Sequence, residues 1–431
     1  MNYGNVRGRM YRFLRWSERY TKTDMVYLSR GSFFSAVAQG TGLVTTLALS
    51  VVVSHYIPKE IYGTYKYILS VVAILSLFSL NSIGTAVFQS TAQGFDGALV
   101  RAFWVNIRWS VGVFLGALGT SLFYFIMDNS TLAISILIGG AFSPFLASAN
   151  LFSQFLNGKK DFYRGMLYTI VDNGIPTLIF IGVILLTTNP IILIATYFTT
   201  NTAAALYFYR RTIHVYHSRL HVQDNSLVGY STRLSLVGVL TGLAQYLDQI
   251  VIFHFLGGTQ LATYGFATAI PDMVKTPVKN VGVMLQPQFV KRTGEEIQHG
   301  MNRKLLLMSI GSIGVTITYI AVAPLIFHTF FPAYADAIWY SQLYALWILT
   351  SALDPVATYL VARKLTVELY VNSGVFVVVG ITSVLVGVLY WGLVGVIFAR
   401  IFTRAMVAIT NYILYRRALA REIGGAHGER T

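Results

Sequence analysis

The chain has 431 residues, of which 55% are hydrophobic and 11% charged, and its mean hydropathy is +0.60. Soluble globular proteins carry about 25% charged residues, so this composition excludes an ordinary soluble domain and indicates a surface covered by lipid. The net charge is +15, and the absence of cysteine excludes disulfides, thiolate metal sites and a thiol nucleophile.

The first segment, residues 1–29, is basic and aromatic and lacks the apolar stretch of a cleavable signal. We expect it to lie on the cytoplasmic membrane surface. Apolar runs of about 20 residues or more follow it, which suits helices rather than the shorter strands of a membrane barrel. The sequence therefore predicts an all-α polytopic membrane protein with twelve transmembrane helices. These spans are expected near 30–55, 62–84, 98–126, 131–156, 163–187, 190–209, 228–256, 260–288, 304–330, 335–361, 366–390 and 392–415.

Lysine and arginine set the orientation, because cytoplasmic loops of membrane proteins are enriched in both. With the N-terminus in the cytoplasm, 25 of the 32 basic residues fall on the cytoplasmic side. Only two, Lys59 and Lys66, fall on the outer side, and the remaining five lie at membrane depth. This asymmetry predicts that both termini are cytoplasmic.

The chain repeats itself at an offset of 199 residues. SHYIPKEIYGTYKY at 54–67 aligns without a gap with FHFLGGTQLATYGF at 253–266. Repeated halves are typical of transporters whose site lies between them. We therefore expect two six-helix halves around a central cavity. The expected divisions are a cytoplasmic basic segment 1–29, an N-terminal half 30–211, a cytoplasmic linker 212–227, a C-terminal half 228–417 and a cytoplasmic tail 418–431.

Pairs of cations lie on single helix faces inside the apolar spans. Lys275 and Lys279 are four residues apart, as are Arg400 and Arg404, so each pair shares one face of a helix. Like charges on adjacent turns repel, which favours an anion between them. A diphosphate suits both ammonium and guanidinium groups. The alternative for the two lysines is internal pairing with Asp272.

Two further arginines, Arg30 and Arg233, lie near the ends of the first and seventh spans. Arginines in such positions either face a substrate pathway or extend to the membrane interface. Both interpretations stay open for these two residues.

The carboxylate of Asp248 lies inside the apolar stretch LAQYLDQIVIFHFL, where a charge costs about 2.5–3.5 kcal/mol on insertion scales. Three roles stay open for it. It can pair with a buried cation such as Lys279 or Arg400, bind a coupling proton or sodium ion, or gate the pathway or bind sugar hydroxyls. Asp172 is a candidate for the same coupling or gating roles.

Several stretches together resemble one family of membrane proteins. They are RGSFFSAVAQGTGLVTTLALS, HYIPKEIYGTYKY, NGKKDFYR, YLDQIVIFHFLGGTQLATYGFA and LQPQFV. In this order they resemble the polysaccharide flippases, of the O-antigen flippase type, in the multidrug/oligosaccharidyl-lipid/polysaccharide exporter superfamily. The resemblance covers essentially the whole chain. It implies translocation of a polyprenyl-diphosphate-linked oligosaccharide, a cell-surface polysaccharide repeat unit, from the cytoplasmic to the outer leaflet of the plasma (inner) membrane by alternating access.

The resemblance also implies which residues bind the substrate. Similar lipid flippases place cations on their first, second and eighth helices around a central cavity, and the corresponding residues here are Arg30, Lys66 and Lys275 or Lys279. Arg233 is then expected at a cytoplasmic entrance. The implied partners are the lipid-linked oligosaccharide and the lipid bilayer, with polysaccharide polymerase or chain-length machinery as a further candidate.

Motifs of several other functions do not occur in the sequence. It contains no GxxxxGK[ST], HExxH or GxSxG pattern, so we expect neither an ATPase nor a hydrolytic enzyme. We expect no cofactor and no metal, and a proton or sodium gradient is the candidate energy source. The basic charge follows membrane topology, which argues against a nucleic-acid partner. Two alternatives stay open: a drug or organic-cation antiporter of the same superfamily, which would favour an acidic or neutral cavity, and a non-transporting membrane scaffold of envelope assembly.

Overall fold

The computed structural model describes residues 25–217, 227–291, 294–363 and 365–428. Every regular element in this part is a helix, as expected for a backbone that must satisfy its own hydrogen bonds in lipid. The elements are α2 (Met25–Tyr56), α3 (Lys59–Ser76), α4 (Ile83–Ala92), α5 (Ala98–Trp109), α6 (Val111–Ile126), α7 (Ser130–Ala149), α8 (Leu151–Gly158), α9 (Phe162–Ile184), α10 (Pro190–Tyr216), α11 (Leu227–Leu256), α12 (Gly258–Lys291), α13 (Gly294–Phe330), η2 (Pro332–Tyr334), α14 (Ala337–Ala345), η3 (Leu346–Leu353), α15 (Asp354–Ala362) and α16 (Thr366–Gly428).

The predicted all-α membrane fold with twelve spans is confirmed for the described residues. Nine stretches of them are long and apolar enough to cross a membrane. One of these, Thr366–Glu422, contains two spans joined at Gly392. α3 and α12 supply the other two, and both carry charged residues, which are Lys59, Glu60 and Lys66 in α3.

Helix ends depart from the predicted divisions at three places. α2 begins at Met25, α10 continues to Tyr216 and α16 continues to Gly428. The helices therefore extend into the predicted N-terminal segment, linker and C-terminal tail. Residues 1–24 and 218–226 lie outside the described structure, so the surface position of the N-terminal segment stays a prediction.

Gly392 turns the chain from the first arm of α16 into the second. Its φ of 57° and ψ of −135° lie in a region that glycine adopts without strain. A Cβ on Gly395 would lie 2.0 Å from the carbonyl oxygen of Gly387 on the other arm. Small residues thus let the two arms pack backbone against backbone beside the turn.

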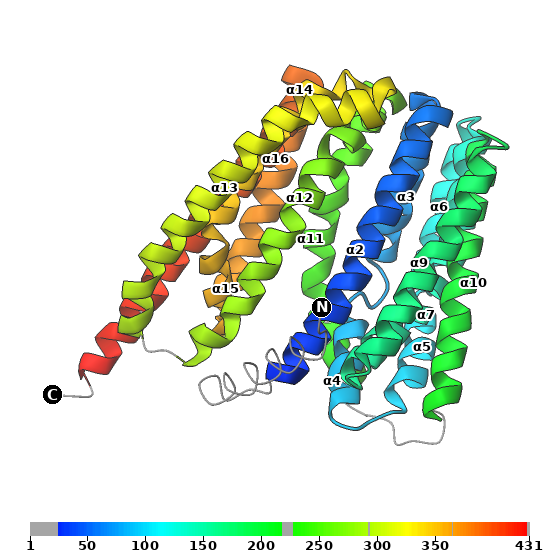
Figure 1. The fold of residues 1–431 in the computed structure, drawn as a ribbon. Coiled ribbons are helices and arrows are strands. Elements are labelled where there is room, and N and C mark those ends of the chain that lie inside the picture. Colours follow the sequence, from blue (N-terminus) through cyan, green and yellow to red (C-terminus); the bar gives the residue numbers. More distant parts are fainter. Residues whose placement is uncertain (1–24, 218–226, 292–293, 364, 429–431) are drawn as a thin grey trace, which may run out of the picture.

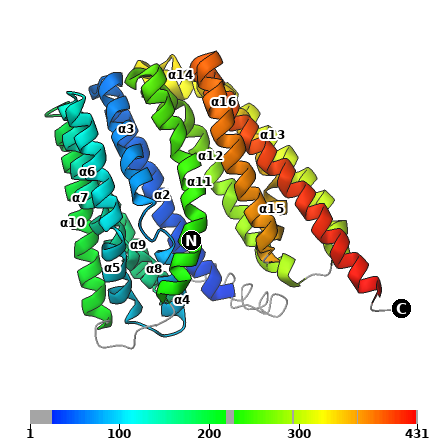
Figure 2. The same ribbon diagram turned by 180° about the vertical axis from the view of Figure 1, so that it is seen from behind.

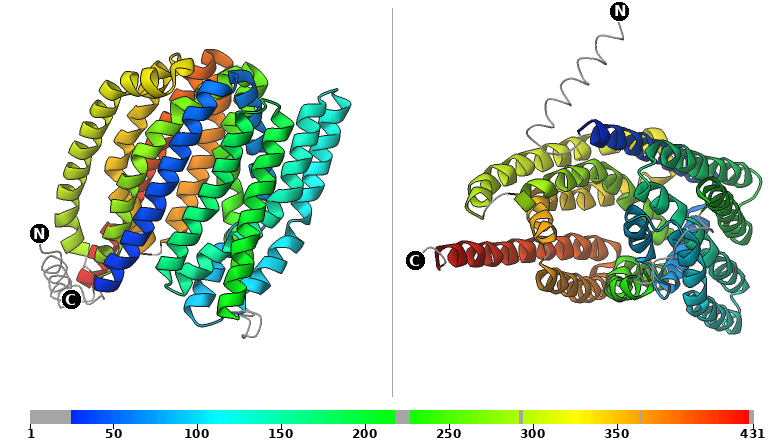
Figure 3. Two further views of the ribbon diagram at one scale, coloured as in Figure 1. Left: turned by 45° about the vertical axis from the view of Figure 1, so that its right-hand side comes forward. Right: turned by 90° about the horizontal axis from the view of Figure 1, so that it is seen from below.

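The helices form two groups (Figure 1). We call α2–α10 the N-terminal group and α11–α16 the C-terminal group. The two meet at the end where α2 is followed by α3 and where α14 lies, which we call the closed end. Toward the opposite, diverging end, α13 and the second arm of α16 lean away from α5, α7 and α10 (Figures 1 and 2). Seen from below, α13 and α16 lie on one side of the molecule and α5 to α7 on the other (Figure 3).

Close backbone packing joins the two groups at the closed end. A Cβ on Gly63 of α3 would lie 1.8 Å from the carbonyl oxygen of Gly258 at the start of α12, so a larger residue cannot make this contact. Lys59 Nζ lies 2.6 Å from Oδ1 of Asp336, which adds an ion pair between the groups. Both contacts hold α3 against the C-terminal group.

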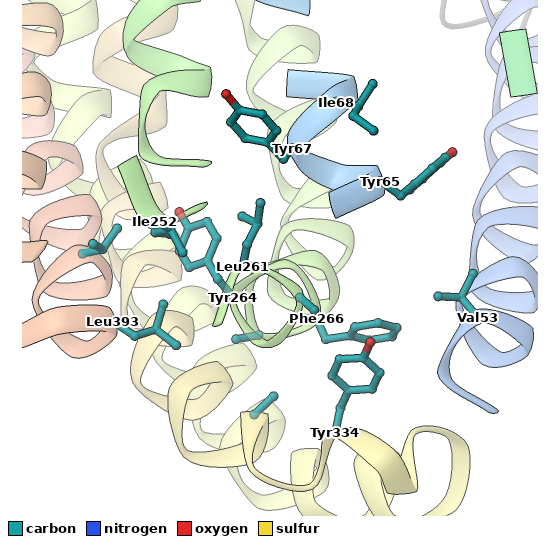
Figure 4. Close-up of a cluster of buried hydrophobic side chains, with 14 of the residues drawn as sticks. Val53, Tyr65, Tyr67, Ile68, Ile252, Leu261, Tyr264, Phe266, Tyr334 and Leu393 are labelled. Atoms are coloured by element: carbon teal, nitrogen blue, oxygen red, sulfur yellow. The ribbon is translucent and has the colours of Figure 1, made fainter. Parts of the chain in front are cut away.

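Aromatic rings fill the space behind these contacts. Phe266 and Tyr334 stack with their ring centroids 3.9 Å apart (Figure 4). Tyr67 of α3 stacks on Phe253 of α11 with centroids 4.0 Å apart, which joins the two groups. Such pairs contribute about 0.5–1.5 kcal/mol beyond the area they bury.

The hydrophobic cores differ between the two ends. At the closed end one cluster joins both groups and includes Tyr65 of α3 and Tyr264 of α12. Toward the diverging end the core divides into smaller clusters. One lies around Phe155 and includes Leu227 in the first turn of α11, so it joins the N-terminal group to α11. Another lies around Tyr359 and Tyr415, within the C-terminal group.

Candidate functional site

A cavity of about 450 Å³ lies between α3, α7, α10 and α11, so both groups contribute to its wall. Ser70 Oγ donates a hydrogen bond to Gln249 Oε1 at 2.6 Å, which joins α3 to α11 along this wall. The described lining carries a cation and neutral polar groups but no carboxylate. The polar residues are Lys66, Ser70, Ser76, Ser143, Asn150, Tyr197, Tyr246 and Gln249.

Lys66 is the cation of this cavity. Its neighbours Tyr65 and Tyr67 are buried in the core of the closed end, and successive helix residues point about 100° apart, so Lys66 is left at the cavity wall. Its Nζ lies 5.8 Å from the ring centroid of Tyr62. No carboxylate in the described part of the chain forms an ion pair with it. Lys66 is therefore half-buried without a counter-charge among the described residues.

Asp248, near the middle of α11, is 1% exposed and lies against α16. Arg400 Nη2 lies 2.5 Å from Asp248 Oδ2, and Arg400 Nε donates to the same oxygen at 2.7 Å. The Tyr264 hydroxyl also donates to Oδ2, and the backbone N–H of Gln249 donates to Oδ1 at 2.9 Å. Charge and hydrogen bonds together compensate the burial of this carboxylate. Of the three roles left open by the sequence, this geometry favours the structural ion pair.

Adjacent residues of α11 thus serve different groups of helices. Gln249 contacts Ser70 in the N-terminal group, whereas Asp248 contacts Arg400 in the C-terminal group. Arg400 also donates to the backbone oxygen of Gln245, one turn before Asp248. α11 and the second arm of α16 are therefore joined by charge, while α11 and α3 are joined by neutral groups.

Arg404 lies one turn after Arg400 on α16 but has different surroundings. Its guanidinium carbon lies 4.8 Å from the ring centroid of Trp347 and 5.9 Å from that of Phe376. It has no ion pair with any carboxylate in the described residues. Cation–π contacts compensate part of the loss of hydration. The two arginines predicted to share one helix face therefore differ in their partners.

A second cavity of about 410 Å³ lies within the N-terminal group, between α2, α9 and α10. Its described lining holds amides and hydroxyls but no charged side chain. Tyr197 forms part of the wall of both cavities, so the two adjoin at this residue. The polar residues are Gln39, Thr45, Thr46, Asn173, Thr177, Tyr197 and Asn201.

Asp172 precedes Asn173 on α9 but does not line either cavity. Its side chain is half-buried, and its Oδ1 is buried without a hydrogen-bond partner among the described residues. An unsatisfied carboxylate oxygen at membrane depth is costly, which singles this residue out for a role that its packing does not explain.

The predicted site residues with described side chains do not line one common cavity. Lys66 lines the first cavity, Arg400 is engaged by Asp248, and Arg404 lies against aromatic rings. Asp172 lies apart from them on α9. The remaining predicted residues have side chains outside the described structure, so their roles stay predictions. They are Arg30, Arg233, Lys275 and Lys279.

Sequence reasoning missed Tyr264 and Tyr197. Tyr264 had a usable signal, because the internal repeat aligns it with Tyr65 and both side chains are buried. Tyr197 had none, since nothing in the apolar run of α10 distinguishes it from the other tyrosines. The neutral lining around Asn173 and Asn201 has no charge that would distinguish it in an apolar span.

No protein-family model matches the sequence, and no curated protein matches it. Solved structures match most of the chain. An inward-facing conformation of a multidrug resistance MATE family transporter of the MOP superfamily matches with a TM-score of 0.71 and 14% identity, covering 89% of this chain and 96% of that chain. An outward-facing conformation of such a transporter gives a TM-score of 0.64 and 14% identity, with 92% and 96% covered.

A third matching structure is a MOP superfamily transporter from Pyrococcus furiosus, reported to have a binding pocket of reversed polarity and to suggest a different function. It matches with a TM-score of 0.60 and 15% identity, covering 92% of this chain and 96% of that chain. The chain is thus a multi-pass helical membrane protein with the fold of MOP superfamily transporters.

Proposed function

We propose that this protein is a transporter, and that it moves a polyprenyl-diphosphate-linked oligosaccharide from the cytoplasmic to the outer leaflet of the plasma (inner) membrane by alternating access. The head group enters the cavity between the two groups of helices, while the polyprenyl chain stays in lipid. The two groups then rock around the bound head group, so that the closed end opens, the diverging end shuts and the head group leaves on the outer side. The sequence resemblance to polysaccharide flippases and the shared fold support this proposal.

The observation that carries it is the ammonium of Lys66, which has no ion pair with a described carboxylate and lies in a cavity with walls from both groups. A half-buried cation without a counter-charge is costly, and an anionic ligand would compensate it. A diphosphate offers two or more negative charges and many acceptor oxygens. Arg404 is a second cation without a described carboxylate partner. Further contacts to the substrate are proposed for Arg30, Arg233, Lys275 and Lys279, but not for Arg400, which is engaged by Asp248.

The polarity of the cavities separates this proposal from an organic-cation antiporter. Such an antiporter would need a carboxylate in its binding site, and neither cavity has one in its described lining. A transporter of this fold with reversed pocket polarity has been described, so the fold is compatible with such a change. The closer match to an inward-facing structure than to an outward-facing one fits a closed end on the outer side.

Energy coupling is proposed for Asp172 rather than for Asp248. Asp248 already has Arg400 as a counter-charge, whereas Asp172 has a buried oxygen without a partner among the described residues. A proton or a sodium ion would satisfy that oxygen. Polysaccharide polymerase or chain-length machinery is the proposed protein partner, and both termini are proposed to lie in the cytoplasm.

The test is transport in proteoliposomes with a fluorescent polyprenyl-diphosphate oligosaccharide and, in parallel vesicles, a fluorescent organic cation. We expect protein-dependent movement of the lipid-linked oligosaccharide and none of the cation. Replacing Asp172 by Asn should remove the response to an imposed proton or sodium gradient. Movement of the cation alone would favour the antiporter, and movement of neither by folded protein would favour the scaffold.

A further inference from the structure

We propose that the second cavity, between α2, α9 and α10, is a glycan subsite that holds the first sugars of the lipid-linked oligosaccharide. This inference rests on the proposed function, because it assigns one part of the same substrate to a site of its own. The diphosphate lies at Lys66 in the first cavity, and the sugars extend past Tyr197 into the second.

The chemistry of the lining matches sugar hydroxyls, which both donate and accept hydrogen bonds. Asn173 makes no side-chain hydrogen bond within the described structure, so its amide offers two donors and one acceptor. Asn201 uses one donor, since its Nδ2 lies 2.7 Å from the Tyr197 carbonyl oxygen, and keeps its side-chain oxygen free to accept.

The threonines of this cavity add acceptors. The hydroxyl of Thr177 donates to the Asn173 carbonyl oxygen at 2.7 Å, and Thr45 and Thr46 donate in the same way to carbonyl oxygens of α2. Their protons are therefore used within the helices, and their lone pairs remain available. Donors from the amides and acceptors from the threonines together suit a neutral polyol.

The same lining is a poor match for other parts of a substrate. Among its described residues there is no cation for a phosphate and no carboxylate for an organic cation. A polyprenyl chain would leave its amides without partners, at a cost of about 1–3 kcal/mol for each unsatisfied group. A neutral sugar satisfies these amides without adding charge.

The geometry connects the subsite to the charged cavity. Tyr197 lies in the walls of both cavities. Its ring packs edge-on against the ring of Tyr65, with centroids 6.2 Å apart, and Tyr65 immediately precedes Lys66 in α3. The volume of about 410 Å³ lies within the range of roughly 300–1,000 Å³ that is typical of small-molecule sites. The side chain of Tyr197 can also stack on a sugar ring that passes between the cavities.

The test is a binding titration of detergent-purified full-length protein with two ligands, polyprenyl diphosphate alone and the same lipid carrying a neutral oligosaccharide. The variants are Asn173→Leu and Asn201→Leu, which lie on different helices, so a folding defect in one leaves the other informative. Thr199→Leu is the matched control, because Thr199 is an exposed residue of α10 that does not line the cavity.

We expect the oligosaccharide to increase the affinity of wild type about tenfold over the bare lipid, as one or two added hydrogen bonds would allow. Asn173→Leu and Asn201→Leu should lose this gain but bind the bare lipid like wild type, and Thr199→Leu should keep it. An equal gain in all variants would overturn the glycan subsite while leaving the proposed function standing. No binding of either lipid by folded wild type would overturn both.

Discussion

Arg400 and Lys66 are both cations within membrane-spanning helices, but they differ in whether a carboxylate lies beside them. The Arg400 side chain is 12% exposed and lies 2.5 Å from the Asp248 carboxylate, which also binds Tyr264. Lys66 is half-buried at a cavity wall and has no carboxylate partner in the described structure. The pair around Arg400 is complete without a ligand, whereas the environment of Lys66 is not.

This difference separates structural charges from charges available to a substrate. A buried ion pair costs much to break and adds little when intact, so the Asp248 pair fixes the position of α11 against α16. An unpaired cation beside a cavity gains from an anion that enters. Variants at Asp248 or Arg400 are therefore expected to change stability, whereas variants at Lys66 are expected to change transport.

The largest expected effect on stability comes from Asp248→Asn. This change leaves the Arg400 guanidinium buried without a counter-charge, which typically costs about 3–5 kcal/mol. A denaturant titration in mixed micelles would measure the loss in the free energy of unfolding. A stability equal to that of wild type would show that Arg400 does not depend on Asp248 and would remove the contrast with Lys66.

Removing both charges should recover most of the stability that Asp248→Asn loses. In Asp248→Leu/Arg400→Met neither charge remains to be buried, so the free energy of unfolding should return to within about 1–2 kcal/mol of wild type. Transport by this variant should keep its response to an ion gradient, because the pair is structural. Loss of that response in a stable double variant would return Asp248 to the coupling role.

Lys66→Met should have little effect on stability and a large effect on transport. The methionine keeps the length of the side chain, and no described ion pair is broken, so the free energy of unfolding should change by less than about 1 kcal/mol. Flipping of the lipid-linked oligosaccharide in proteoliposomes should fall at least tenfold, and Lys66→Arg should retain part of it. Severe unfolding of Lys66→Met would instead indicate a structural charge.

The smallest effect is expected at the closed end, for Lys59→Met. Its partner Asp336 is 51% exposed, and ion pairs of this kind contribute about 0–1 kcal/mol. The change in the free energy of unfolding should shrink further as salt is raised, because exposed charges are screened. A loss as large as that of Asp248→Asn would place the main interaction between the two groups of helices in this pair.

The fold could be predicted from the sequence because lipid leaves few choices. Apolar runs of spanning length must be helices, and the number of such runs gives the number of spans. The orientation expected from lysine and arginine stays a prediction. Finer features could not be predicted. The break between α3 and α4 and the continuation of α16 to Gly428 depend on packing rather than on hydropathy.

The candidate site was predictable only in part. A carboxylate in an apolar span demands a partner, so pairing of Asp248 with Arg400 could be named as one option. Equal four-residue spacing could not show that Arg404 lies against Trp347 while Arg400 lies against Asp248. Neutral residues such as Asn173 carry no signal in a single sequence, because amides and threonines occur in many membrane helices.

The most direct test of the account is binding of a polyprenyl diphosphate to wild type, Lys66→Met and Lys59→Met in detergent. Both variants lose one lysine of α3, but only Lys66 lines the cavity. The account predicts that wild type and Lys59→Met bind with similar affinity and that Lys66→Met binds at least tenfold more weakly. Equal binding by all three proteins would contradict it, since the anion would then be held by other residues.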